Sequence, residues 1–125
     1  MSTLAWPPRS VTAVRWIARL LGLCLLLLWG AFFVEHLQWF AQPGQWPPAK
    51  VIVLQLVHLA MLAGLVLAWK WELIGSILVI ASALAFFSQT AGGSFLLFSS
   101  ITSLPAILWL YCHWRTHSQS LAAKP

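Results

Sequence analysis

The sequence contains no aspartate and only two acidic residues, Glu35 and Glu72, among 125. Charged side chains make up 7% of the chain, whereas a soluble domain carries about 25%. So few charges cannot cover a water-exposed surface, which excludes a soluble globular domain. Two cysteines, Cys24 and Cys112, are too few to form a disulfide framework.

The sequence also lacks the motifs of common catalytic and nucleotide-binding sites. It has no serine–histidine–acid set, no glycine-rich phosphate loop and no Cys-x-x-Cys pair. The net charge of +5 does not indicate nucleic-acid binding, because the basic residues flank apolar runs instead of forming a patch. We therefore expect a protein that is not an enzyme, has no nucleic-acid partner and has no firmly indicated cofactor.

What the chain does contain is apolar sequence, at 61% of its residues. Four apolar runs approach or exceed the roughly 20 residues that cross a bilayer. They predict an all-α integral membrane four-helix bundle in a single transmembrane domain, with helices at about 16–40, 49–69, 72–88 and 95–113. No small-residue cleavage site follows the first run, so we expect it to be retained as a span. Residues 1–14 are expected to be a polar lead, 113–125 a mobile tail, and Pro105 a kink in the fourth helix.

The stretch between the second and third runs has the composition of a turn at a membrane face. Lys70 would lie at the negative end of one helix dipole and Glu72 at the positive end of the next. Trp69 and Trp71 supply amphipathic rings that settle at headgroup level. Anchoring explains these four residues, and a docking site for a partner is the alternative.

Two motifs resemble those of an uncharacterised family of small bacterial four-helix membrane proteins. The first is Arg-Trp-Ile-Ala-Arg at residues 15–19, and the second is Gly-Leu-x-Leu-Ala-Trp-Lys/Arg-Trp-Glu-x-x-Gly at 64–75. The family often continues with a second glycine, where this chain has Ser76. The resemblance implies a four-helix membrane protein and no established activity.

Basic residues are distributed unequally between the two ends of the predicted bundle. Four spans put both termini on one side, and six of the seven Lys and Arg residues fall there: Arg9, Arg15, Arg19, Lys70, Arg115 and Lys124. The other side holds only Lys50. Because positive loops stay in the cytoplasm, both termini are predicted to be cytoplasmic. The resemblance to bacterial proteins implies the bacterial inner (cytoplasmic) membrane.

The second run carries a stripe of small residues and a polar face. Ala60, Gly64 and Ala68 recur every fourth residue, which allows another helix to approach closely. Gln55 and His58 share a different face of the same helix. The stripe suggests packing against a neighbouring helix, a homo-oligomer or a larger membrane complex.

Glu35, His36, Gln55 and His58 are the candidate polar pocket. All four fall in the outer half of the first two predicted helices, whose outer ends are joined by one loop. Intramembrane ionisable groups suggest function, and imidazole is a common metal or haem ligand. These side chains could simply be hydrated or hydrogen-bonded across helices. The alternatives are ligation of haem or a metal by His36 and His58, and the handling of protons or cations.

Three functions fit these features. The first is a non-enzymatic accessory bundle that associates with itself or with a larger complex in the lipid bilayer. The second is a small transporter, since length and helix count resemble the small multidrug-resistance transporters, although Glu35 lies further out than the glutamate those proteins use. The third is a haem- or metal-binding membrane subunit.

The topology can be tested by cysteine labelling in intact cells. In a background without Cys24 and Cys112, a cysteine at Gly44 is expected to react with an impermeant thiol reagent, and one at Thr116 is not. The expectation follows from the six-to-one split of basic residues. Labelling at Thr116 and protection at Gly44 would reverse the orientation.

Overall fold

The computed structural model describes residues 9–41, 44 and 46–122. Within these ranges the chain is all-α and has no strand. Its helices are α1 (Arg9–His36), η1 (Leu37–Phe40), α2 (Ala49–Leu67), α3 (Glu72–Thr90), η2 (Gly92–Ser94) and α4 (Phe95–Ala122), of which η1 and η2 are 3-10 turns. The predicted all-α fold of four long helices is confirmed. Each of the four is long and apolar enough to cross a membrane.

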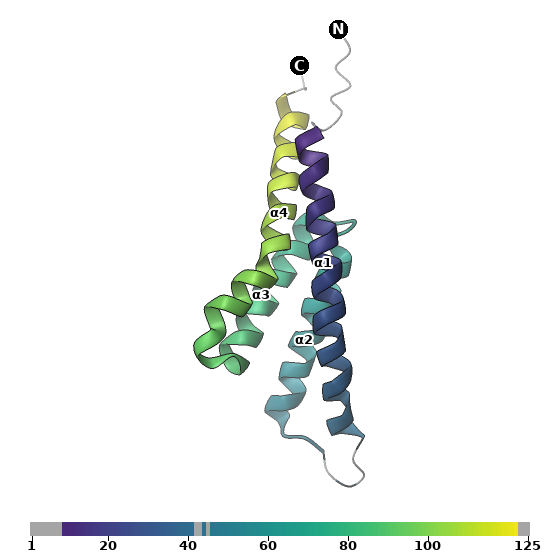
Figure 1. The fold of residues 1–125 in the computed structure, drawn as a ribbon, viewed down its shortest axis with the longest axis vertical. Coiled ribbons are helices and arrows are strands. Elements are labelled where there is room, and N and C mark those ends of the chain that lie inside the picture. The colour runs from purple at the N-terminus through teal and green to yellow at the C-terminus, as the bar shows by residue number, and fades with distance from the viewer. Residues whose placement is uncertain (1–8, 42–43, 45, 123–125) are drawn as a thin grey trace.

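The helices come in two lengths. Helices α2 and α3 have 19 residues each, about 28 Å at 1.5 Å per residue, which matches a hydrocarbon core of about 30 Å. Helices α1 and α4 have 28 residues each, about 42 Å. Figure 1 shows the consequence: the purple end of α1 and the yellow end of α4 continue well beyond the α2–α3 turn.

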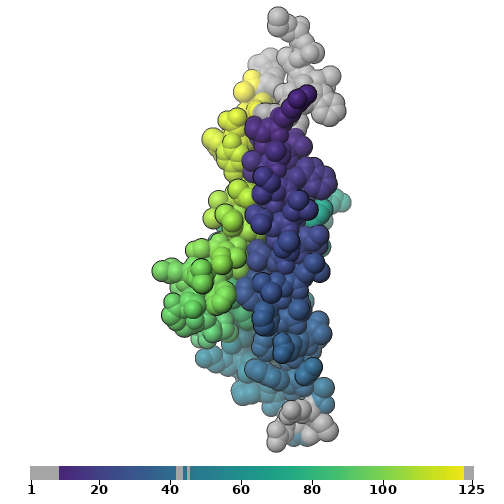
Figure 2. Space-filling view, in the orientation of Figure 1, coloured from purple at the N-terminus to yellow at the C-terminus, as the bar shows by residue number. Residues whose placement is uncertain are grey.

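Both long helices extend further than the sequence predicted. Helix α1 begins at Arg9, within the expected polar lead, and α4 continues to Ala122 through the expected mobile tail. The reason is tertiary: Val11 and Cys112 are fully buried against each other's helix, and the Cys112 thiol donates to the Val11 carbonyl at 3.6 Å. The space-filling view shows these two extensions side by side (Figure 2). The rest of the lead, residues 1–8, and of the tail, 123–125, lies outside the described residues.

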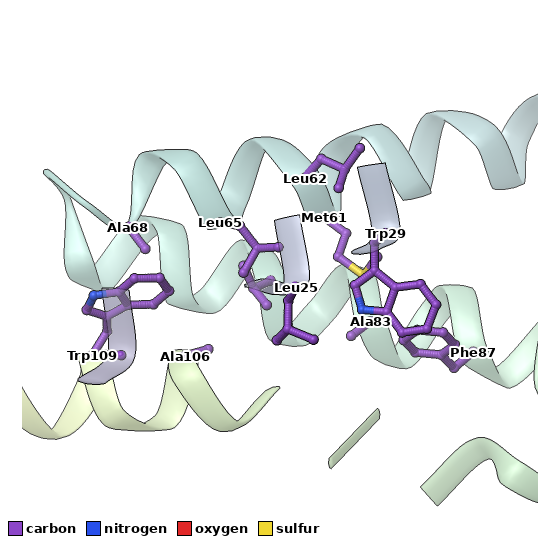
Figure 3. Close-up of a cluster of buried hydrophobic side chains, with 12 residues drawn as sticks. Leu25, Trp29, Met61, Leu62, Leu65, Ala68, Ala83, Phe87, Ala106 and Trp109 are labelled. Carbon is purple, nitrogen blue, oxygen red and sulfur yellow. The ribbon is translucent and has the colours of Figure 1, made fainter. Parts of the chain in front are cut away.

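The four helices pack in a ring in chain order. Helix α3 packs most extensively, against α2 and α4, and α1 packs more against α4 than against α2. Large side chains from different helices fill the centre (Figure 3), where Trp29, Met61, Leu65 and Trp109 are each at most 8% exposed. The mid-span indole of Trp29 is satisfied there, because its N–H donates to the Thr102 hydroxyl at 3.1 Å.

The small-residue stripe of α2 contacts α3 of the same chain. A methyl group added at Gly64 would lie 2.8 Å from Cγ2 of Val79, and one at Gly75 would lie 2.7 Å from Cβ of Ala68. Gly64 and Ala68 are buried, and Ala60 is partly buried. The close approach predicted from the stripe therefore occurs inside the bundle, so Gly64 and Ala68 are not free to meet a second copy.

Pro105 lies inside α4, fully buried, and the helix continues through it. In Figure 1 the green amino-terminal part of α4 leans away from the line of its yellow carboxyl-terminal part. This change of direction agrees with the kink expected from a proline within a helix.

The α2–α3 contact predicts different outcomes for two glycine substitutions. Gly75→Ala should lower the free energy of unfolding by about 1–3 kcal/mol, because the added methyl group meets the backbone of Ala68. Gly30→Ala is the matched control, since a methyl group there has no neighbour within 4 Å. It should leave stability unchanged or raise it by up to about 1 kcal/mol, since alanine favours helix. Equal effects of both substitutions in a detergent unfolding titration would contradict the tight contact.

Candidate functional site

The polar face of α2 turns toward α1. The Gln55 side-chain amide donates to the Phe33 carbonyl at 3.1 Å. The His58 side chain is 1% exposed and lies between two phenylalanine rings. Its ring centroid is 5.4 Å from that of Phe33, which is perpendicular to it, and 4.7 Å from that of Phe86. Neither of its ring nitrogens has a hydrogen-bond partner among the described residues. His58 is thus a buried imidazole enclosed by aromatic rings from α1 and α3.

Glu35 and His36 do not join Gln55 and His58. His36 Nδ1 lies 2.6 Å from the Phe32 carbonyl of its own helix, and its ring stacks edge-on against Trp39 at 5.1 Å. Glu35 is exposed. Helix geometry explains Glu35: Phe33 occupies the face of α1 that meets His58, and Glu35, two residues on, points about 200° away. His36 lies about 60° from Phe33 around the helix, and its ring packs against Trp39.

The structure therefore brings together two of the four predicted pocket residues. Gln55 and His58 both meet α1 at Phe33, while Glu35 and His36 lie outside that contact. Among the described residues, no three histidine, cysteine, aspartate or glutamate side chains cluster as a metal site. Ligation of haem or a metal by His36 and His58, which needs only two histidines, stays a prediction.

The other end of the bundle holds the densest polar contacts. Arg15 of α1 donates through Nε to Oε1 of Glu72 in α3 at 2.5 Å, and through Nη2 to the Thr116 hydroxyl of α4 at 3.1 Å. The Arg15 and Glu72 side chains are 19% and 14% exposed. A single guanidinium thus ties three helices together beside the α2–α3 turn.

A second arginine holds the turn itself. Arg19 donates to the Trp69 carbonyl at 3.2 Å, and its guanidinium lies 5.0 Å from the Trp16 ring and 5.4 Å from the Trp69 ring. Lys70 is placed similarly, 5.2 Å over the Trp71 ring. The predicted interfacial tryptophans therefore also serve as cation–π partners of the basic residues next to them.

A groove of about 550 Å³ opens at this end. Its lining residues come from α1, from the α2–α3 turn with the first turn of α3, and from the part of α4 that extends beyond that turn. The imidazoles of His113 and His117 stack in parallel along the α4 wall, 6.0 Å apart. The ionisable and hydrogen-bonding side chains of the groove include Arg15, Lys70, Glu72, His113, Thr116 and His117.

The sequence pattern indicated Lys70 and Glu72 but not their neighbours. Glu72 was expected to match the helix dipole and not to pair with Arg15, and His113, Thr116 and His117 were expected in a mobile tail. One signal could have found the ion pair. In the predicted topology α1 and α3 start at the same end, and Glu72 is the one acidic residue there.

Comparison of the sequence with known protein families gives a match over most of the chain. The model of a domain of unknown function, DUF7670, matches residues 8–122. The chain belongs to the DUF7670 family. No curated protein and no solved structure shows a significant match. Membership in DUF7670 agrees with the resemblance to an uncharacterised family, and it covers all four helices and the groove.

The contribution of the Arg15–Glu72 ion pair to stability can be tested by substituting each of the two acidic residues of the chain. Glu72→Gln should lower the free energy of unfolding by about 1–3 kcal/mol, because it leaves a partly buried guanidinium without its carboxylate. Glu35→Gln removes the same charge at an exposed position and should change stability by less than about 0.5 kcal/mol. In a double-mutant cycle, Arg15→Gln should cost little more once Glu72 is replaced. Additive losses would show that the two side chains act independently.

Proposed function

We propose that this chain is a small non-enzymatic accessory protein of the bacterial inner membrane, with both termini in the cytoplasm. The charge distribution supports the orientation. Five of the six described Lys and Arg residues lie at the end that holds the α2–α3 turn: Arg9, Arg15, Arg19, Lys70 and Arg115. The opposite end has Lys50 alone, and positive charge is retained on the cytoplasmic side.

The filling of the bundle centre is the observation that favours an accessory role. Trp29, Met61, Leu65 and Trp109 occupy the middle of the molecule from three different helices. They belong to one cluster of buried apolar side chains, part of which is drawn in Figure 3, and no described lysine, arginine or glutamate is buried. A bundle built in this way acts through its surfaces, by contact with lipid and with other membrane proteins.

The outward face of α3 is the surface proposed for association with a second copy. Ala81 and Ala85 are exposed and lie four residues apart on this face, and Ser88 follows one turn later. Small side chains facing lipid let another helix approach closely, which is the main source of helix association in a bilayer. This surface takes the role that the stripe on α2 was expected to have.

Photo-cross-linking in living cells tests the proposal. A benzophenone amino acid at Ala85 should give an adduct at about twice the mass of the chain, because α3 of a second copy would lie against it. Leu59, 48% exposed on the outer face of α2, is the matched lipid-facing control and should give little adduct. An adduct of another size from Ala85 alone would indicate a larger complex, and equal or absent adducts at both positions would reject association along α3.

A further inference from the structure

The groove beside the α2–α3 turn lies at the depth of lipid headgroups. The turn is reached from α2 and α3, whose lengths match the hydrocarbon core, so residues between Leu67 and Glu72 emerge at its boundary. Exposed indoles of Trp16, Trp71 and Trp114 surround this level, as tryptophans do at a membrane interface. A ligand in the groove would therefore contact the headgroup layer directly.

Hydrogen-bond donors in the groove come from elements that are fixed by other contacts. Arg15 donates through Nε to Glu72 and through Nη2 to Thr116. Because a guanidinium has five N–H donors, its remaining N–H groups can bind a ligand. Lys70 is exposed at the rim. On the opposite wall, the parallel rings of His113 and His117 offer further ring nitrogens.

The charge of the groove favours an anion. Arg15 and Lys70 contribute two positive charges and Glu72 one negative charge, which leaves a net charge of +1 before any histidine is protonated. Glu72 opposes an anion, but one of its oxygens is already bonded to Arg15. The surrounding cations Arg9, Arg19 and Arg115 have no further acid among the described residues at this end.

An apolar surface continues from the groove into the membrane. Leu73 and Ile74 line the groove and are 41% and 61% exposed, and Ile77 follows one turn deeper on α3 at 56%. An acyl chain could lie along these side chains while its phosphate rests among the donors. A free phosphate compound would use the donors but not this surface.

We propose that the groove is a binding site for the phosphate of an anionic phospholipid, with an acyl chain against the first turns of α3. Basic grooves between helices on the cytoplasmic side are suited to such headgroups, and each Lys or Arg near the surface strengthens binding severalfold. A zwitterionic lipid would gain less, because its own cation meets Lys70 and Arg15. Ile74 and Ile77 lie on the same face of α3 as Ala85, but Ala85 is 11 residues further along the helix than Ile74, and the phosphate donors come from other elements. The lipid titration and the cross-link at Ala85 report on different contacts, so either proposal can fail alone.

Native mass spectrometry of the purified full-length chain tests the site by titration with dioleoylphosphatidylglycerol or dioleoylphosphatidylcholine. The first phosphatidylglycerol should bind at least about tenfold more tightly than phosphatidylcholine. Lys70→Gln should weaken this binding by roughly fivefold to tenfold, since it removes a cation from the groove. Arg9→Gln removes the same charge at the same end but outside the groove, and it should change the affinity by less than about twofold.

The remaining outcomes separate the possible ligands. Equal affinity for the two lipids, or equal losses from Lys70→Gln and Arg9→Gln, would overturn the site. Glycerol 3-phosphate should not displace the lipid at equal concentration, and displacement would assign the groove to a soluble phosphate compound instead. If Lys70→Gln reduces helix content, His117→Phe removes the ring nitrogens from the opposite wall while it keeps an aromatic ring there. It should weaken phosphatidylglycerol binding more than the same control, Arg9→Gln, does.

Discussion

The close approach of α2 and α3 is the contact on which the other features of the bundle depend. In lipid the hydrophobic effect does not draw helices together, so packing of small residues has to do so. Gly64 and Gly75 face each other's helices so closely that neither position has room for a methyl group. This contact fixes the turn between the two helices, and with it the place of Lys70 and Glu72. The ion pair with Arg15 and the groove beside the turn are built on that position.

Polar groups follow different rules at the two depths of the molecule. In the core there are few polar groups. The indole of Trp29 donates to Thr102, and the imidazole of His58 is surrounded by aromatic rings. At the end with the α2–α3 turn they form a connected set, in which Arg15 joins α1 to α3 and α4. Apart from Glu35 and Lys50 at the opposite end, the described Lys, Arg and Glu side chains lie at this end, where lipid headgroups and water would solvate them. The proposed lipid site belongs to this second environment.

Unequal helix lengths create the groove. Helices α2 and α3 are about as long as a hydrocarbon core is thick, whereas α1 and α4 continue by several turns and pair with each other through Val11 and Cys112. The extension of α4 then stands over the turn and supplies His113, Thr116 and His117 as a wall. With helices of equal length, the same charges would lie on a flat end. The chemistry proposed for this end therefore depends on a length difference as much as on residue type.

The sequence by itself determined the all-α class, the four apolar helices and the asymmetry of charge, because hydrophobic runs and flanking basic residues are local signals that need no knowledge of neighbours. It also located Gly64 and Ala68 as a site of close packing. Only the tertiary structure decided which helix packs against Gly64 and Ala68 and which face of α1 meets His58. It also decided that α1 begins as early as Arg9 and that α4 continues to Ala122. Each of these depends on residues far apart in the chain, such as Arg15 and Glu72, and periodicity cannot specify their rotation about the helix axes. For that reason the predicted pocket of Glu35, His36, Gln55 and His58 came together only in part, and the groove became visible only in the folded bundle.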